Sequence, residues 1–415
     1  MQVQSKSNRF AKILAFVILW HFFFASSFVL RLNPKLFWPA MFVIAVISLV
    51  YKKQLMQDTE VYYFAFLSAG FILCLFSADT AHSAINDLYY FIYLGVAVMI
   101  ARNISTKSII KLALAFCIVH LICIYIQVFL PDLYESAILP LLPSYVYDNI
   151  ITQMTYNSSY YGFTVQTSVA AMYFAIGAIC AAVLIRYETK RWKKIIYVVL
   201  IALFITGVLF TTRRGSLLAL CLVLLYAYFD GSRSKFSRIL LLVVAAVVLL
   251  LFGIEKIPGM QGMMDKMTRL TGNTMNGREE TWGIALENYW NYPFFGYGVG
   301  NAEVAANGAS VDNAYLAVLI ERGAVGTVVW FMPIIMIFCR TVRIKRSVKD
   351  LAVDFSFYIQ LLFVIMSFME NYLGQATAMF FYYLAVMSAD FSILGENNYE
   401  SDEFYKENSR SKSLL

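Results

Sequence analysis

The chain has 415 residues, of which 60% are hydrophobic and 14% charged. Its mean hydropathy of +0.67 lies far above the range of soluble globular domains. This composition excludes a soluble enzyme and predicts an all-α polytopic integral membrane protein. The net charge of +7 follows from the placement of the basic residues described below, so no nucleic-acid partner is implied.

Apolar runs long enough to cross a bilayer predict about twelve transmembrane helices. They lie at 10–30, 36–51, 61–78, 84–101, 108–130, 165–186, 194–211, 214–230, 236–254, 313–339, 351–369 and 374–394. We therefore divide the chain into four regions: nine N-terminal helices (1–254), a large loop with short helices (255–311), three C-terminal helices (312–394) and a polar, disordered tail (395–415).

Lysine and arginine concentrate on one side of this arrangement. Of the 33 basic residues, 24 fall in segments that the twelve helices place on a common side, namely 1–12, 52–53, 102–111, 186–194, 233–238, 340–349 and 406–412. By the positive-inside rule these segments are cytoplasmic. Both termini then lie inside, and the loop 255–311 lies on the outer side of the membrane.

Cysteine and histidine give no sign of disulfide or metal chemistry. The six cysteines fall in or at the ends of predicted helices, so we expect no disulfide. The three histidines are scattered without the spacing of metal ligands. We therefore predict neither a metal site nor a cofactor.

The sequence TTRRGS, Thr211–Ser216, joins two predicted helices with almost no linker. Arg213 and Arg214 therefore lie at the outer membrane boundary, on the side that the positive-inside rule keeps poor in basic residues. An arginine at mid-bilayer costs roughly 2.5–3.5 kcal/mol, and less near the interface. One interpretation is that these side chains extend to lipid headgroups. A pair of arginines at this face favours the other interpretation, an anionic partner.

The segment 277–326 concentrates tryptophan, glycine, asparagine and charge in an otherwise apolar chain, which indicates a functional surface. Asn276, followed by Glu279 and Glu280, predicts an N-cap and a helix over about 277–290. Arg278 falls in the first turn of that helix, where its guanidinium and the free backbone N–H groups favour an anion. The alternative is a solvated arginine paired with Glu279 or Glu280.

The glycine run PFFGYGVG, 293–300, lacks the spacing of a nucleotide-binding loop, and no βαβ unit surrounds it. It indicates a turn whose backbone closely approaches a ligand or a neighbouring helix. Asp312 then begins a helical run that Gly323 and Gly326 interrupt. Asp312 is either the N-cap of that run or a functional group.

The order of TTRRGS, GREETW, NYPFFGYGVG and DNAYLAVLIERGAVG over about 205–340 resembles the bacterial O-antigen polymerase and O-antigen ligase superfamily. The resemblance implies that a glycan is moved between lipid-linked carriers at the periplasmic face of the bacterial inner membrane, without a nucleotide sugar or a metal. The family's arginines correspond to Arg213 or Arg214 and to Arg278. Ligases typically have His-Asn where this chain has Asp312 and Asn313.

A polysaccharide polymerase is the leading prediction. The donor is then a glycan on undecaprenyl pyrophosphate, and the acceptor is the next lipid-linked repeat unit. The expected pyrophosphate-binding residues are Arg213, Arg214 and Arg278. Asp312 or Glu321 deprotonates or orients the acceptor hydroxyl, unless Glu321 is only a structural partner of Arg322. The expected acceptor contacts are Trp282, Tyr297 and Asn313.

Two alternatives remain open at this stage. A ligase would transfer the finished glycan to a lipid A core, and a lipid-linked oligosaccharide flippase would need no catalytic loop. The roughly 57-residue loop from 255 to 311 disfavours the flippase, which works between helices near mid-membrane. The expected partners are the lipid-linked oligosaccharide, membrane lipid, and a chain-length regulator and a flippase of the same pathway.

Overall fold

The computed structural model describes residues 9–27, 29–31, 33, 37–44, 58–230 and 274–390, and these residues form helices and connecting turns without a β-strand. Within these ranges, six helices are long and apolar enough to cross a membrane. They are 59–76, which comprises most of α3 (Asp58–Leu73) and all of η1 (Cys74–Phe76), and then α4 (Thr80–Asn103), α5 (Thr106–Phe129), α8 (Thr167–Tyr187), α9 (Arg191–Phe210) and α15 (Ala314–Ser347). The fold is therefore that of an all-α polytopic membrane protein, as predicted.

Shorter helices coincide with further predicted spans: α1 (Arg9–Phe23), α10 (Arg214–Asp230), α16 (Leu351–Met366) and a helix over 376–390. The predicted span 236–254 lies outside the described residues, as do 255–273 of the large loop and the tail from 395. The number of twelve spans stays a prediction.

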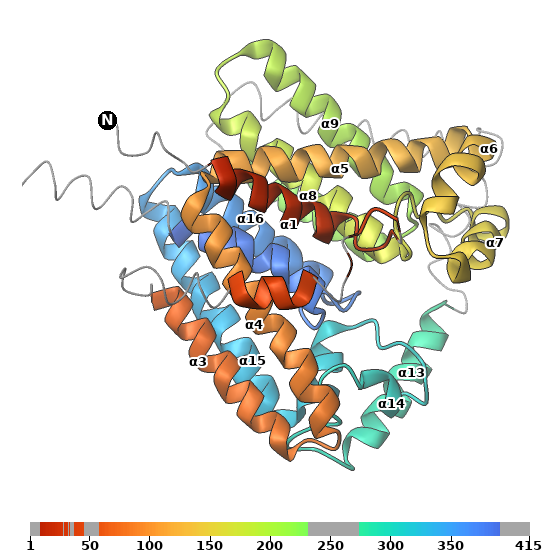
Figure 1. Ribbon diagram of the computed structural model, residues 1–415, viewed down its shortest axis with the longest axis vertical. Helices are drawn as coiled ribbons and strands as arrows, with labels where there is room; N and C mark the ends of the chain where they lie inside the picture. The colour runs from red at the N-terminus through yellow and green to blue at the C-terminus, as the bar shows by residue number, and fades with distance from the viewer. Residues whose placement is uncertain are drawn as a thin grey trace, which may run out of the picture.

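Helix α8 lies at the centre of the bundle because its side chains are small. Its sequence contains alanine at six positions and one glycine, and nearly its whole length is buried. A Cβ on Gly177 would lie 2.5 Å from the Phe204 ring of α9 and 2.8 Å from Cys117 of α5. Small residues of this kind let helix backbones approach closely in membranes. Figure 1 shows α5, α8 and α9 lying together, with α3, α4 and α15 forming a second group.

Contacts between helix ends define two ends of the bundle. The beginnings of α8, α10 and α15 meet the end of α16, through Arg213 with Thr167 and Glu370 and through the Ala314 N–H with the Ser367 carbonyl. The opposite ends of the same helices meet around Arg186. We call these the Arg213 end and the Arg186 end.

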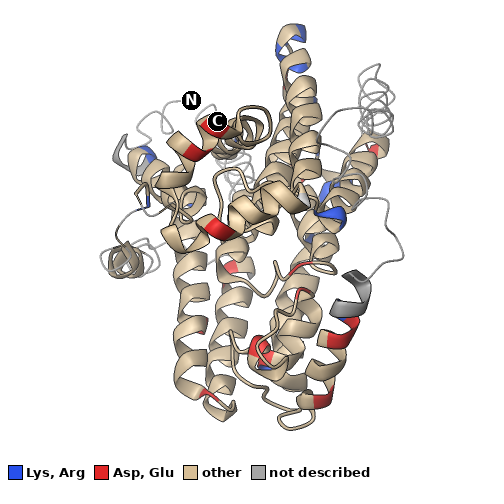
Figure 2. Cartoon of the chain, turned by 90° about the vertical axis from the view of Figure 1, so that its right-hand side faces the viewer, with Lys and Arg blue, Asp and Glu red and all other residues tan. Residues whose placement is uncertain are grey.

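Short helices cover the Arg213 end. They are α6 (Pro131–Leu133), α7 (Tyr147–Asn157), α13 (Thr274–Tyr289) and α14 (Ala302–Ala305), and they gather on one side of the molecule in Figure 1. Figure 2 looks onto this side, where acidic residues are prominent on α13. The segment 131–157 between α5 and α8 is thus largely helical, and the described part of the large loop, 274–311, contains the two helices α13 and α14.

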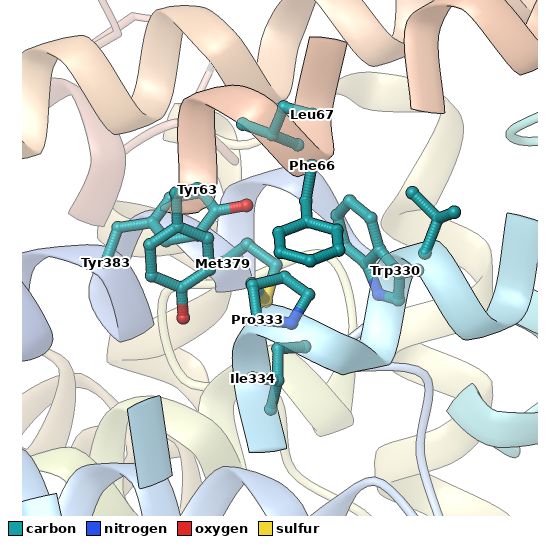
Figure 3. A pocket seen from close by; sticks show the side chains of 9 residues that line it. Tyr63, Phe66, Leu67, Trp330, Pro333, Ile334, Met379 and Tyr383 are labelled. Carbon is teal, nitrogen blue, oxygen red and sulfur yellow. The ribbon is translucent and has the colours of Figure 1, made fainter. Parts of the chain in front are cut away.

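A small apolar hollow lies between α3, α15 and the helix 376–390 (Figure 3). Phe66, Trp330, Pro333 and Met379 line it together with other uncharged side chains. Pro333 cannot donate a helical hydrogen bond and its ring displaces the preceding turn. We interpret the hollow as a packing feature beside this proline.

Candidate functional site

Four charged side chains from four separate segments meet at the Arg213 end. Arg213 Nη1 lies 2.7 Å from Glu370 Oε1. Arg278 Nη2 lies 3.2 Å from Asp312 Oδ2 and 3.9 Å from the same Glu370 oxygen. The structure therefore brings together three of the residues that the sequence singled out, Arg213, Arg278 and Asp312, around a carboxylate that it did not.

The two guanidinium groups remain accessible. The side chains of Arg213 and Arg278 are 30% and 35% exposed, Asp312 is 31% exposed, and Glu370 is 8% exposed. A guanidinium presents five N–H donors in a planar fork. Two such forks on separate elements, each facing a carboxylate and solvent, form an arrangement that can exchange a carboxylate for a phosphate oxygen.

A tight turn between α9 and α10 positions Arg213. Its Nε donates to Thr167 Oγ1 over 2.7 Å, so the side chain is held from two sides. Gly215 explains the RRGS sequence, because a Cβ there would lie 2.4 Å from Met369 Cβ. Only glycine lets the Arg213 turn approach the Glu370 turn this closely.

Thr212, directly before Arg213, has a left-handed backbone with φ of 56°. A β-branched residue rarely adopts this conformation, which costs on the order of 1–3 kcal/mol and persists only where the surroundings enforce it. The Thr212 hydroxyl lies 2.7 Å from that of Ser159, and the Tyr160 N–H donates to the Phe210 carbonyl over 3.0 Å. The segment after α7 thus holds the turn.

Helix α13 positions Arg278 through a small apolar core. Ala285 of α13 packs with Ala302, Ala305 and Ile320 of α14 and α15, and Asn288 Nδ2 donates to the Ala305 carbonyl over 2.7 Å. The helix begins at Thr274, so the predicted N-cap at Asn276 is wrong. Arg278 lies in the second turn rather than the first, and its position rests on this packing rather than on the free N–H groups of a helix terminus.

Asp312 is not the N-cap of α15. Asn313 takes that role, since its Oδ1 accepts from the Tyr315 and Leu316 N–H groups over 2.9 and 3.0 Å, and its Nδ2 donates to the Phe368 carbonyl over 3.1 Å. Asp312 is therefore available to the site, with Arg278 on one oxygen and Ser310 on the other. The Asn313 contacts also fix the start of α15 against the Glu370 turn.

The glycine run 293–300 completes a break in α15. Gly323 has φ of 64° inside this helix, and the free backbone groups around it pair with the run. The Tyr297 and Gly298 N–H groups donate to the Ile320 and Glu321 carbonyls over 2.9 and 2.8 Å. A Cβ on Gly296 would lie 2.3 Å from the Glu321 carbonyl oxygen. The run is thus a turn that closely approaches a helix, one of the two interpretations that the sequence left open.

Glu321 and Arg322 belong to this break rather than to the charged cluster. Both are buried. The Glu321 carboxylate bonds the backbone N–H groups of Gly300 and Ala302, while Arg322 Nη2 lies 2.5 Å from Asp87 Oδ1 and its guanidinium carbon lies 4.2 Å from the centre of the Trp330 ring. The alternative that Glu321 pairs with Arg322 is replaced by a pair between Arg322 and Asp87.

The remaining predicted site residues have identifiable structural surroundings. Trp282 packs on the core beneath α13. The Tyr297 hydroxyl donates to the Asn288 carbonyl over 2.9 Å and accepts from Asn291. Arg214 is half-buried at the first residue of α10. The sugar-contacting role that we predicted for Trp282, Tyr297 and Asn313 stays a prediction.

Glu370 is the residue that sequence reasoning missed. It follows α16 in the short turn before 376–390. Burial raises the pKa of its carboxyl above the ordinary value and nearby Asp312 adds to this, while the charges of Arg213 and Arg278 oppose it. For Arg213, burial lowers the pKa, but the Glu370 carboxylate outweighs this and the net shift is upward. The sequence did contain a signal for Glu370, because it is an acidic residue in a short turn on the same predicted side of the membrane as Arg213 and Arg278.

A family model described as O-antigen ligase matches residues 199–331. No curated protein matches the chain. The matched stretch includes Arg213, Arg278 and Asp312, three of the four members of the charged cluster. Residues 199–331 are thus similar to a family described as O-antigen ligase, in agreement with the resemblance to the O-antigen polymerase and ligase superfamily.

Proposed function

We propose that the protein is a polymerase of lipid-linked polysaccharide repeat units, which transfers the growing glycan from undecaprenyl pyrophosphate to a hydroxyl of the next lipid-linked repeat. The observation that carries this proposal is the convergence of Arg213 and Arg278, from two separate elements, on the shared carboxylate Glu370. Two partly exposed guanidinium groups that share one carboxylate suit a leaving group with two phosphates.

In the proposed reaction, the acceptor oxygen forms a bond to the anomeric carbon of the donor glycan. The bond from that carbon to the pyrophosphate oxygen breaks, and the electron pair leaves with the pyrophosphate. Arg213 and Arg278 stabilise the charge that develops there, with Arg214 as a further candidate. Two guanidinium groups supply the positive charge that other glycosyltransferases obtain from a metal ion, so we propose a metal-independent reaction.

The acceptor hydroxyl loses its proton in this step. Asp312 lies at the edge of the cluster, with Arg278 and Ser310 on its two oxygens. A carboxylate already bound to a guanidinium is a weak base, so we assign Asp312 the orientation of the hydroxyl. Glu370 also contacts a guanidinium, but burial outweighs that charge and raises the pKa of its carboxyl, so we assign Glu370 the acceptance of the proton.

Location follows from the asymmetry of the basic residues. We propose the bacterial inner membrane, with the Arg213 end in the periplasm and the Arg186 end in the cytoplasm. Reporter fusions at Lys193 and Lys345 should behave as cytoplasmic and a fusion at Asp148 as periplasmic. A periplasmic signal at Lys345 would contradict this orientation and place the cluster on the wrong side for a periplasmic reaction.

The decisive experiment separates polymerase from ligase. A deletion strain should carry one repeat unit per lipid A core on gels of its surface glycan, and purified protein should lengthen lipid-linked repeat units without any core present. Surface glycan missing altogether, together with transfer to a core acceptor and no lengthening of repeats, would replace this proposal by the ligase. Loss of surface glycan with neither activity would indicate a flippase.

A further inference from the structure

Among the described residues, three non-glycine positions have a left-handed backbone: Ser158, Thr212 and Asn307. Asn307 is exposed in the loop after α14, and asparagine tolerates this conformation well. Thr212 differs because it is β-branched and directly precedes Arg213. Backbone strain at such a position is associated with sites where geometry must be fixed.

The contacts of Thr212 join two segments that are distant in sequence. Its N–H donates to the Leu209 carbonyl over 2.9 Å, which closes the turn after α9. Its hydroxyl lies 2.7 Å from the hydroxyl of Ser159, which is buried at the end of the α7 segment. The turn is therefore held from outside, by the segment that connects α7 to α8.

The turn determines where the next side chain points. Immediately after Thr212, the Arg213 guanidinium bonds Thr167 on α8 and Glu370 beyond α16 over 2.7 Å each. An extended or right-handed backbone at residue 212 would change the direction of the chain entering α10 and move this guanidinium. We infer that Thr212, held left-handed by Ser159, is a positioning residue for Arg213, an inference that rests on the proposed role of Arg213 in binding pyrophosphate.

Thr212→Gly tests this inference because glycine adopts the left-handed backbone without strain but does not enforce it. Folding should not suffer, so the melting temperature should stay the same or rise. Turnover of lipid-linked repeats should fall by about tenfold to a hundredfold, as expected when a catalytic group is displaced by about 1 Å. Ser159→Ala should also lower turnover. Thr212→Ser keeps the hydroxyl and should therefore have nearly the turnover of the wild type.

Asn307→Gly is the matched control. It relaxes a left-handed position outside the cluster, so both its melting temperature and its turnover should equal those of the wild type. If Thr212→Gly and Ser159→Ala also retain wild-type turnover, the positioning role is wrong. A loss of turnover that is accompanied by an equal loss of folded protein in both variants, and is not restored by Thr212→Ser, would also contradict it.

Binding of inorganic pyrophosphate separates this inference from the proposed function. The wild type should bind pyrophosphate more tightly than Thr212→Gly, in protein purified in detergent and without any glycan. If this difference is observed but lipid-linked repeats are never extended, the polymerase proposal fails while the positioning of Arg213 stands. If repeats are extended and Thr212→Gly matches the wild type in both assays, the polymerase proposal stands and the positioning role of Thr212 is wrong.

Discussion

Two clusters of two basic and two acidic residues lie at opposite ends of the same helices, and they are built differently. At the Arg186 end, Arg186 and Lys345 each contact both Asp230 and Asp354. Hydroxyls of Tyr187 and Tyr358 bond the same carboxylates over 2.9 and 2.8 Å. Each charge there has several partners, all of them on helix ends that are packed against one another.

The cluster at the Arg213 end is looser. Its contacts lengthen from 2.7 Å to 3.9 Å across the cluster, and Arg278 comes from α13, outside the main bundle. Its arginines are 30% and 35% exposed, whereas at the other end Arg186 and Asp230 are 24% and 26% exposed and Lys345 and Asp354 only 7% and 6%. Two clusters of equal charge composition therefore have different roles: the cluster at the Arg186 end holds helix ends together, and we propose that the cluster at the Arg213 end exchanges its carboxylate partners for a phosphate.

Lysine substitutions should produce the largest difference between the two ends. Arg213→Lys and Arg278→Lys keep the charge but lose the planar fork, so turnover should fall by about 10²–10³-fold, nearly as far as with alanine. Protein level in the membrane should be unchanged. The measurement is glycan chain length on gels together with turnover of the purified protein.

Arg186→Lys is the control at the other end. It should alter the melting temperature while the glycan chain length stays that of the wild type. Wild-type chain length in both Arg213→Lys and Arg278→Lys would show that the planar guanidinium geometry is not required and that positive charge alone suffices at the Arg213 end.

Asp312 should show a smaller and graded effect. If it orients the acceptor hydroxyl, Asp312→Asn keeps an accepting oxygen and should reduce turnover by about tenfold, whereas Asp312→Ala should reduce it by about a hundredfold. Equal losses of more than a thousandfold in both variants would instead identify Asp312 as the base. The rate at saturating acceptor distinguishes these outcomes from weaker binding.

The sequence predicts the membrane fold well because hydrophobic length is a local property. The predicted span 214–230 coincides with α10, and 194–211 differs from α9 by a few residues. Arg213 and Arg278 are also detectable, since a charge in an apolar chain is itself a local signal. The described part of the chain thus supports the helix assignments made from sequence, while the total number of spans is untested.

The composition of the cluster could not be predicted, because it depends on which turns meet in space. Glu370 is separated by 157 residues from its partner Arg213, and the close approach depends on Gly215 against Met369. Glu321 illustrates the opposite case. Its position beside the glycines suggested chemistry, but its carboxylate bonds backbone N–H groups at the start of α14. The local sequence therefore does not show that Glu370 enters the charged cluster and that Glu321 does not.

The pH dependence of anion binding should sharpen the role of Glu370. Because the pKa of its carboxyl is raised by burial, this carboxyl takes up a proton at a higher pH than an ordinary glutamate as the pH falls. The protonated form favours the folded state, and that contribution is lost as the pH rises through the raised pKa. Protonation also removes a negative charge beside Arg213 and Arg278.

At pH 7.5, Glu370→Gln should bind inorganic pyrophosphate about five- to tenfold more tightly than the wild type, the size expected for one partly screened charge. The two proteins should converge as the pH falls toward the ordinary glutamate range. Because both proteins meet the same pyrophosphate protonation states, their ratio isolates residue 370. A ratio that stays constant with pH would show that Glu370 does not titrate against the bound anion.

The smallest effect on turnover is expected at the Arg186 end. Lys345→Met alone leaves Asp354 without one of its two basic partners, and removing one member of a buried pair typically destabilises a protein by about 3–5 kcal/mol. In the double variant Lys345→Met, Asp354→Leu, the pair Arg186–Asp230 at 3.0 Å remains neutral, and apolar side chains of similar volume replace the other pair. Such replacements are often neutral or stabilising, so the double variant should recover most of the melting temperature.

The turnover and glycan chain length of this double variant should stay within about twofold of the wild type, because only the Arg213 end is proposed to meet the substrate. Recovery of stability with a persistent loss of turnover would mean that the two ends are coupled through α8, α10, α15 and α16, and that the cluster at the Arg186 end takes part in the reaction cycle.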